Sequence, residues 1–173
     1  KLFYGDFEQG LNGWKPSVPE EGVSIVESNS IIKSKHIRID NSDATRLLNR
    51  NVSTIASGDF VLSLKGYSES STAEIRVLFI NTQSSDEPPL GVQDIMLSNV
   101  LEDFSILQSF PPSLNETDGV QVRIKALSGS GIHLDDIHFR SANELERALS
   151  ACSDADQVIP DLPFSQVPVT NLE

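Results

Sequence analysis

Apolar and polar residues alternate in short runs along residues 1–140, and Gly, Ser, Asn and Pro separate the runs. Alternation with a period of two is typical of strands that bury one face. Many such strands at this spacing predict an all-β fold, an antiparallel β-sandwich. The predicted strands are 2–4, 23–27, 30–33, 35–40, 46–54, 59–67, 72–81, 91–98, 102–110, 119–127 and 131–139.

The alternation also predicts which side chains of the middle strands face outward. It is clearest in VQVRIKA at 120–126 and also present in 60–67 and 72–81. We expect the core-facing residues to be Phe60, Leu62, Leu64, Ile75, Val77, Phe79, Val120, Val122, Ile124 and Ala126. We expect the outward-facing residues to be Ser63, Lys65, Tyr67, Glu74, Arg76, Gln121, Arg123 and Lys125.

Helical periodicity first occurs after the last strand. Residues 141–152 predict a short helix, with Ser141 and Glu144 spaced as a capping box. Residues 153–173 contain prolines and acidic residues without periodicity, and are interpreted as a linker or extended tail. Residues 1–140 then form one module, and a linker implies a neighbouring domain in a larger protein.

The composition excludes several classes of partner. The 173 residues include 13 Lys and Arg against 25 Asp and Glu, a net charge of −12. Binding of nucleic acid requires a basic footprint, so neither nucleic acid nor an acidic membrane surface is an expected partner. The sequence has no run of about twenty apolar residues, which argues against membrane insertion. The single cysteine, Cys152, cannot form an internal disulfide.

An acidic pair interrupts the last predicted strand. Asp135 and Asp136 lie within GIHLDDIHFR at 131–140, among residues that otherwise suit a buried strand. Strict alternation places Asp136 on the core side and Asp135 on the face of His133 and Ile137. A buried acid needs a positive partner, and calcium is a candidate because it binds carboxylate and carbonyl oxygens. The alternative is a solvated acid pair at the end of a strand.

Three stretches together resemble a known family. GDFEQGLNGWKP at 5–16, SKHIRID at 34–40 and GIHLDDIHF at 131–139 are similar, in this order, to motifs of carbohydrate-binding modules with a galactose-binding-like jelly-roll fold. The resemblance implies two antiparallel sheets and a structural calcium ion that joins the first strand to the last. The acids of these motifs are Asp6, Glu8, Asp135 and Asp136.

The resemblance also assigns roles within these motifs. It implies calcium ligands at Glu8 and at Asp135 or Asp136, with backbone carbonyls near Asp6 and near residues 34–36, and it favours Asp135 over Asp136. Trp14, which closes the first motif, is expected to pack in the core rather than to stack on a sugar.

The outward-facing residues suggest where a glycan would bind. If the middle strands are neighbours in one sheet, Lys65, Tyr67, Arg76, Gln121, Arg123 and Lys125 form a basic groove with one aromatic side chain. Such a groove suits an anionic or highly hydroxylated glycan, because Arg binds carboxylate or sulfate through parallel hydrogen bonds. Gln93 and Asp94 are candidate rim residues. The alternative is a solvated face on which Glu74 pairs with Arg76 or Lys65.

No set of residues predicts catalysis. Cys152 lies in the predicted linker, where nothing lowers its pKa. His133 and His138 are expected to project to opposite faces of one strand, so they cannot share a metal ion.

The resemblance instead implies a non-catalytic, secreted or extracellular module. Such a module binds polysaccharide or oligosaccharide as a monomer and holds an attached catalytic domain near its substrate. The alternative is a structural or adhesive domain that binds no glycan.

Overall fold

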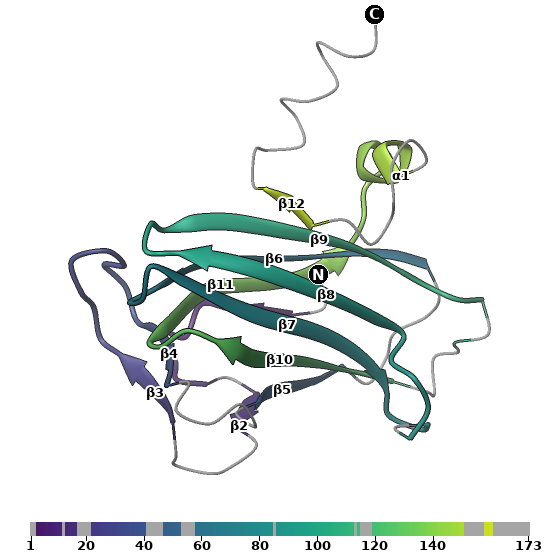
Figure 1. The fold of residues 1–173 in the computed structure, drawn as a ribbon. Helices are drawn as coiled ribbons and strands as arrows, with labels where there is room; N and C mark the ends of the chain where they lie inside the picture. Colours follow the sequence, from purple (N-terminus) through teal and green to yellow (C-terminus); the bar gives the residue numbers. More distant parts are fainter. Residues whose placement is uncertain are drawn as a thin grey trace, which may run out of the picture.

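Antiparallel strands form two sheets that pack face to face (Figure 1). The computed structural model describes residues 3–11, 13–16, 22–40, 47–52, 58–84, 86–112, 114, 119–150 and 158–160. The seven-stranded sheet has the order β12-β9-β6-β11-β4-β3, with β1 also paired to β11, and the five-stranded sheet has the order β2-β5-β10-β7-β8. The predicted all-β sandwich with a short C-terminal helix is confirmed.

The strands are β1 Phe3–Gly5, β2 Trp14–Pro16, β3 Val23–Val26, β4 His36–Ile39, β5 Leu47–Val52, β6 Gly58–Ser68, β7 Thr72–Asn81, β8 Gly91–Ser98, β9 Glu102–Phe110, β10 Val120–Ser128, β11 Ile132–Ser141 and β12 Val158–Pro160, and the helix is α1 Glu144–Ser150.

Three segments differ from the predicted elements. Residues 30–33 are not a strand, because the Asn29 side chain accepts hydrogen bonds from the amides of Ile31 and Ile32 and closes a turn. Strand β2 is too short to show alternation and was not predicted. Strand β12 lies inside the predicted linker, where it pairs with β9 and ends at Pro160.

The chain crosses repeatedly from one sheet to the other. Strand β6 belongs to the seven-stranded sheet, β7 and β8 to the five-stranded sheet, and β9 again to the seven-stranded sheet. Outward-facing residues of β6 and β7 therefore lie on opposite sides of the molecule, although these strands are consecutive.

The core lies between the sheets. The apolar residues predicted to face inward from β6, β7 and β10 are all buried there. Phe60, Phe79, Phe110 and Phe139 form an aromatic cluster, with the Phe60 and Phe110 ring centroids 5.3 Å apart. Trp14 is buried in the same core, which confirms the expectation that it packs inward.

A β-bulge breaks the alternation of β11. Its pairing with β6 shifts between Asp135 and His138, and Asp136 has a φ of 49°. The extra residue returns Ile137 to the core beside Phe139, so the prediction that Ile137 shares a face with Asp135 is wrong.

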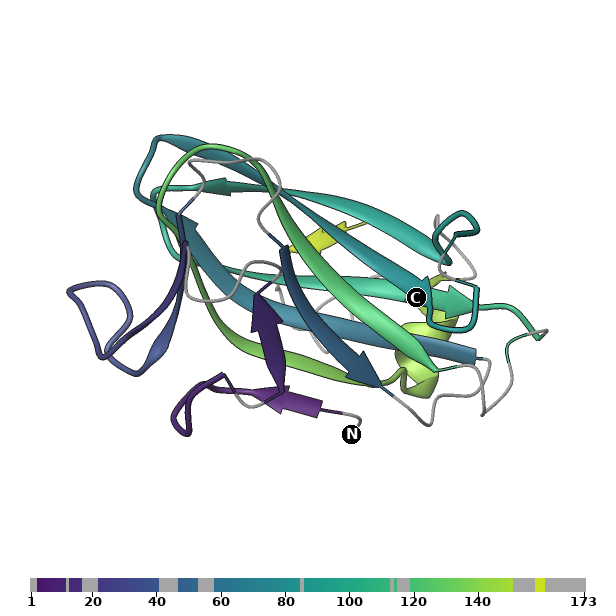
Figure 2. The ribbon, with the colours of Figure 1, turned by 90° about the horizontal axis from the view of Figure 1, so that it is seen from below.

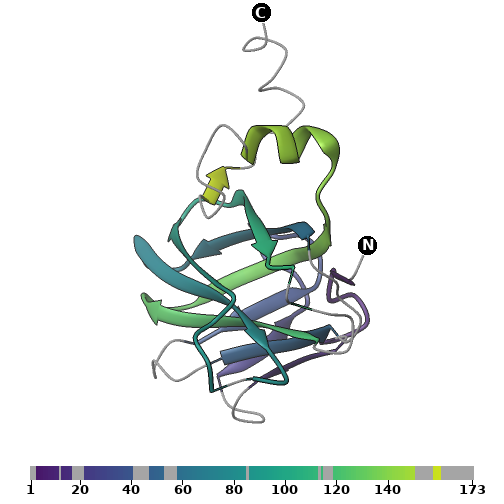
Figure 3. The ribbon, with the colours of Figure 1, turned by 90° about the vertical axis from the view of Figure 1, so that its right-hand side faces the viewer.

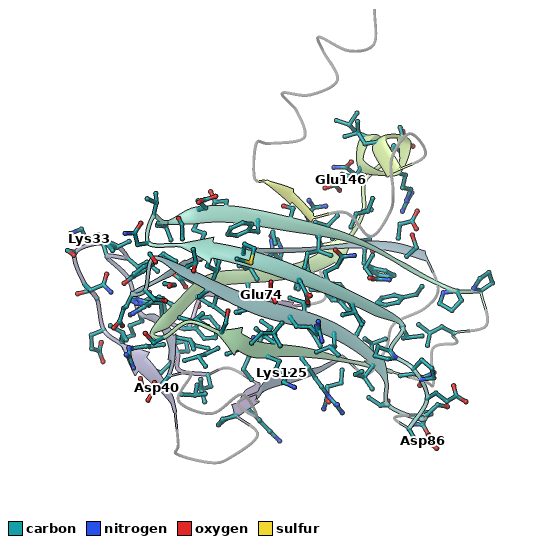
Figure 4. The ribbon with its side chains drawn as sticks, viewed as in Figure 1. Lys33, Asp40, Glu74, Asp86, Lys125 and Glu146 are labelled. Carbon is teal, nitrogen blue, oxygen red and sulfur yellow. The ribbon has the colours of Figure 1, made fainter. Side chains whose placement is uncertain are left out.

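At one end, the segment that joins β11 to α1 covers part of the outer face of the seven-stranded sheet, and α1 itself lies beyond the edge of the sheets (Figure 3). Ala142 packs on Val61 and Leu107. Glu146, in the first turn of α1 and labelled in Figure 4, is fully buried and accepts hydrogen bonds of 2.6 and 2.7 Å from Arg140. The capping box consists of Asn143 and Glu146, which bond each other's backbone amides, rather than Ser141 and Glu144.

At the other end, the loop between β3 and β4 covers the same face. Tyr67 stacks on His133 with ring centroids 4.5 Å apart, and its hydroxyl accepts a hydrogen bond from Asn29. Glu69 lies 2.7 Å from His133 Nε2 and accepts two hydrogen bonds from Arg38. These contacts lower the pKa of Glu69 to about 2, with the Arg38 hydrogen bond as the largest cause.

No helix within the described ranges is long and apolar enough to cross a membrane.

We predict that Glu146→Gln destabilises the fold by about 2 to 3 kcal/mol, because it removes the negative charge of a buried ion pair and leaves Arg140 without its partner, although Gln can still cap the Asn143 amide. Urea unfolding measures the change. The matched control is Glu144→Gln, an exposed residue in the first turn of the same helix, which should cost about 0.5 kcal/mol or less. Equal midpoints for both variants would contradict the anchoring role of Glu146.

We predict a pH-dependent contribution from Glu69. Because its folded pKa is lowered, the stabilisation is complete above the unfolded pKa of about 4.3 and is lost as the pH falls towards 2. The carboxylate is partly exposed, so the effect is about 1 kcal/mol. The stability gap between the parent chain and Glu69→Gln should close between about pH 5 and 2. Glu87→Gln, in the exposed β7–β8 loop, should show no such gap, and a gap that widens in acid would contradict the assignment.

Candidate functional site

The outer face of the five-stranded sheet carries a group of basic and amide side chains, which we call the cationic face. Its members are Lys15 on β2, Arg76 on β7, and Gln121, Arg123 and Lys125 on β10. Figure 4 shows Lys125 on this sheet, with Glu74 on the neighbouring strand. The sheet forms the front layer in Figure 1.

Strand pairing places these residues in two adjacent rows. Lys15 lies opposite Asn49, and Asn49 lies opposite Arg123. Lys125, two residues beyond Arg123, lies opposite Arg76. Neighbouring strands are about 4.8 Å apart and alternate residues about 7 Å apart, so the basic residues fall within one small area.

Arg76 is already neutralised within this face. Its Nε and Nη2 atoms donate hydrogen bonds of 2.8 and 3.0 Å to the two carboxylate oxygens of Asp94 on β8. This bond raises the pKa of Arg76 and lowers that of Asp94. The alternative pairing with Glu74 is not formed. Gln93, the other candidate rim residue, is buried instead.

Arg123, Lys125 and Lys15 remain without a counter-ion among the described residues. Arg123 is held by Gln121 on the same strand, because Nε of Arg123 donates a hydrogen bond to Oε1 of Gln121. Basic side chains therefore outnumber the described acids of this face, Asp94 and Glu74, although the whole chain carries −12.

The expectation that six residues share one groove is wrong for Lys65 and Tyr67. Both lie on β6, in the opposite sheet. Tyr67 is 4% exposed beneath the β3–β4 loop, and the Lys65 ammonium lies 3.6 Å from the Asp136 carboxylate. Alternation predicted that both face outward, but it does not show to which sheet a strand belongs.

No aromatic side chain within the described part of the chain is exposed for stacking on a sugar. Wherever their side chains are described, the Trp, Tyr and Phe residues are buried: Phe7, Trp14, Phe60, Tyr67, Phe79, Phe104, Phe110 and Phe139. The outer face of the five-stranded sheet instead exposes the aliphatic residues Val92 and Met96 on β8. Any glycan on this face is held by polar and aliphatic contacts.

A second candidate site lies along β11, at the point where its pairing with β4 ends and its pairing with β1 begins. Strand β1 pairs with residues 137–139 of β11, and β4 pairs with residues 132–134 (Figure 2). Asp135 and Asp136 occupy the gap. The turn that follows β1 contains Glu8, and the turn that precedes β4 contains Ser34 and Lys35.

Glu8 and Asp135 both bind the turn before β4. The Glu8 carboxylate accepts a hydrogen bond of 3.0 Å from the Lys35 amide. The Asp135 carboxylate accepts one of 2.9 Å from the Ser34 hydroxyl. These two hydrogen bonds connect β11 and the turn after β1 to the turn before β4.

Asp135 is a buried acid whose charge is poorly compensated. It is 3% exposed, and its Oδ1 atom has no hydrogen-bond partner. Burial raises its pKa to about 6, against smaller lowering effects from the Asp136 amide and the Ser34 hydroxyl. A cation placed at Oδ1 would remove this cost.

The acids predicted to bind metal do not form one cluster. Asp6 accepts a hydrogen bond from the Glu8 amide, closing a local turn, and Asp136 pairs with Lys65. Across the described ranges, no group of three or more His, Cys, Asp or Glu side chains could hold a metal ion. A calcium ion here would need carbonyl or water oxygens in addition to Glu8 and Asp135.

The histidines form a structural network rather than an exposed catalytic group. The bulge puts His133 and His138 opposite Tyr67 and Ser63, which both face outward, so the prediction that they project to opposite faces is wrong. His36 Nε2 lies 2.9 Å from His133 Nδ1. Both rings are buried, which keeps substrate away from them, and burial lowers the pKa of His133.

Sequence reasoning missed two contributors. Lys15 joins the cationic face because β2 pairs with β5, a contact that a three-residue strand does not reveal by periodicity. The Ser34 hydroxyl was missed because it contacts Asp135 across a large sequence separation.

Comparisons with known proteins identify the fold. No protein-family model and no curated sequence matches the chain. The CBM22-1 xylan-binding domain of Paenibacillus barcinonensis Xyn10C has a TM-score of 0.61 at 11% identity, covering 82% of this chain and 96% of that one. TmCBM61, solved with β-1,4-galactotriose, has a TM-score of 0.56 at 13% identity, covering 80% and 95%.

A CBM4 structure has a TM-score of 0.55 at 15% identity, covering 75% of this chain and 86% of that one. At such low identity the likeness concerns the fold. The chain has the β-sandwich fold of carbohydrate-binding modules.

Proposed function

We propose that this chain is a non-catalytic polysaccharide-binding module and that the cationic face is its glycan surface. The observation that carries the proposal is an asymmetry between the two outer faces. Ala142 and the β3–β4 loop cover parts of the seven-stranded sheet, whereas the five-stranded sheet presents Arg123, Lys125 and Lys15 without counter-ions from the described residues. The xylan- and galactan-oligosaccharide-binding modules of the same fold support a carbohydrate ligand.

An anionic glycan suits this surface best. The unpaired cations attract carboxylate or sulfate groups, and the absence of exposed aromatic rings among the described residues removes the stacking contact used for neutral chains.

In a larger protein, the module would raise the local concentration of substrate around an attached enzyme domain. A secreted enzyme domain joined through the C-terminal segment would be held near polysaccharide that the module binds, which raises its effective substrate concentration. The rings of His36 and His133 are buried against each other, which favours binding without cleavage.

We also propose a structural calcium ion at Glu8 and Asp135. The support is the orphaned Oδ1 of Asp135, together with the hydrogen bonds that bring both carboxylates to the Ser34–Lys35 turn. Bound there, the ion would compensate the Asp135 charge and fasten β1 and β4 to β11.

The alternative function is a structural or adhesive domain that packs against a neighbouring catalytic domain. Its support is the exposed aliphatic pair Val92 and Met96, which lies on the same outer face. This alternative predicts no glycan binding at all.

We predict that Arg123→Ala combined with Lys125→Ala weakens glycan binding at least tenfold, because each charge-assisted hydrogen bond contributes about 1.5 to 3 kcal/mol. Affinity electrophoresis in a panel of neutral and anionic polysaccharides, followed by calorimetry, measures the change. The matched control is Lys65→Ala, which removes an exposed cation from the opposite sheet and should leave affinity unchanged. If the intact chain binds no glycan at millimolar concentration, the structural alternative is correct.

We predict that calcium raises the melting temperature and that a chelator lowers it. An ion at a hundredfold excess over its Kd stabilises by about 2.7 kcal/mol, which is about 5 to 10 °C for a domain of this size. Asp135→Asn should abolish the calcium-dependent shift, whereas Asp136→Asn should keep it, since Asp136 pairs with Lys65. A melting temperature that is indifferent to calcium would refute the site.

A further inference from the structure

Arg123 is the one arginine of the cationic face whose guanidinium is both held in place and open to a ligand. Gln121 accepts the hydrogen bond from Nε, which holds the guanidinium group from the side. No described residue accepts a hydrogen bond from Nη1 or Nη2 of Arg123. With respect to the described residues, Nη1 and Nη2 of Arg123 are therefore an oriented pair of hydrogen-bond donors for a ligand.

Arg76 shows the complementary arrangement on the neighbouring strand. It holds the Asp94 carboxylate through Nε and Nη2, with both oxygens engaged. The cationic face thus already binds one of its own carboxylates in the bidentate manner. Among the described arginine side chains of this face, Arg123 alone keeps both terminal nitrogens available for the carboxylate of a ligand.

Lys125 and Lys15 flank this fork. Lys125 is two residues from Arg123 on the same face of β10, a separation of about 7 Å. Lys15 lies two strands away, across Asn49, a separation of about 10 Å. A chain with an acid group on successive sugar residues could bring further carboxylates to these ammonium groups.

The negative net charge of the protein favours a carboxylated polysaccharide over a densely sulfated one. With a net charge of −12, the protein as a whole repels polyanions, so recognition depends on short-range, directional hydrogen bonds rather than on the general field. A densely sulfated chain would require many more cations than this face supplies. A carboxylate is planar and carries a single charge, which matches one guanidinium fork.

We propose that the cationic face takes a carboxylated polysaccharide, a polyuronate, with Nη1 and Nη2 of Arg123 holding one uronate carboxylate. Lys125 and Lys15 contact neighbouring carboxylates, and Gln121 is a positioning residue that orients the Arg123 fork. This inference rests on the proposed polysaccharide-binding function and names the ligand class for the same surface.

The test uses short oligosaccharides of polygalacturonate, alginate and glucuronan, each beside its carboxyl-reduced counterpart, with calorimetry at physiological salt. We expect the chain to bind at least one uronate series and to bind the reduced form of that series about tenfold more weakly or not at all. Arg123→Lys keeps the charge but removes the fork, and should also weaken binding about tenfold.

Gln121→Ala should weaken uronate binding severalfold while circular dichroism shows that the fold is retained, and Lys65→Ala should have no effect on binding. Three results would each overturn the carboxylate assignment while leaving polysaccharide binding intact. They are equal binding of a uronate series and its carboxyl-reduced counterpart, full affinity in Arg123→Lys, and preference for dextran sulfate over every uronate. Failure to bind every glycan, neutral or anionic, would overturn the proposed function as well.

Discussion

Strand β11 is paired along one edge first by β4 and then by β1, and the bulge at Asp136 lies where one partner gives way to the other. An extra residue in the strand lets the core side chains resume on the correct side, with Ile137 and Phe139 both buried. It also leaves Asp135 directed towards the turn before β4, buried and with one oxygen unpartnered. The closure of the sandwich and its candidate ion site therefore follow from the same local irregularity.

That closure determines which surface is available for binding. With β1 and β4 fastened to β11, the β3–β4 loop lies over Tyr67 and His133, and Ala142, just before α1, covers the other end of the same sheet. The five-stranded sheet lies on the other side of the core, and Arg123 and Lys125 face outward from its middle strand. Under the proposed function, the closure of the fold and the recognition of glycan therefore depend on different sheets.

Much of this arrangement was predictable from the sequence, and the failures share a physical cause. Alternation identified the long strands and the outward-facing members of β7 and β10, because a sandwich buries one face of each strand. It did not show that β6 and β7 belong to different sheets, so Lys65 and Tyr67 were grouped with residues on the far side of the molecule. Sheet membership depends on contacts that are distant in sequence.

Local irregularities were the other source of error. The turn at Asn29 replaced a predicted strand because a side-chain oxygen took the backbone amides that a neighbour strand would use. The helix cap was placed two residues early, since Ser141 still belongs to β11 and Asn143 supplies the same spacing to Glu146. The acid that matters most, Asp135, was singled out by its motif, although only the bulge explains its position.

The central claim is that polysaccharide binds the outer face of the five-stranded sheet. Amide chemical-shift mapping with a bound oligosaccharide tests it most directly, because it locates the ligand without altering any residue. The account predicts that the largest shifts fall on β10 and β7 around Arg123, Lys125 and Arg76, with little change on β6 and β11. Shifts concentrated around Lys65 and His138, on the opposite sheet, would contradict it.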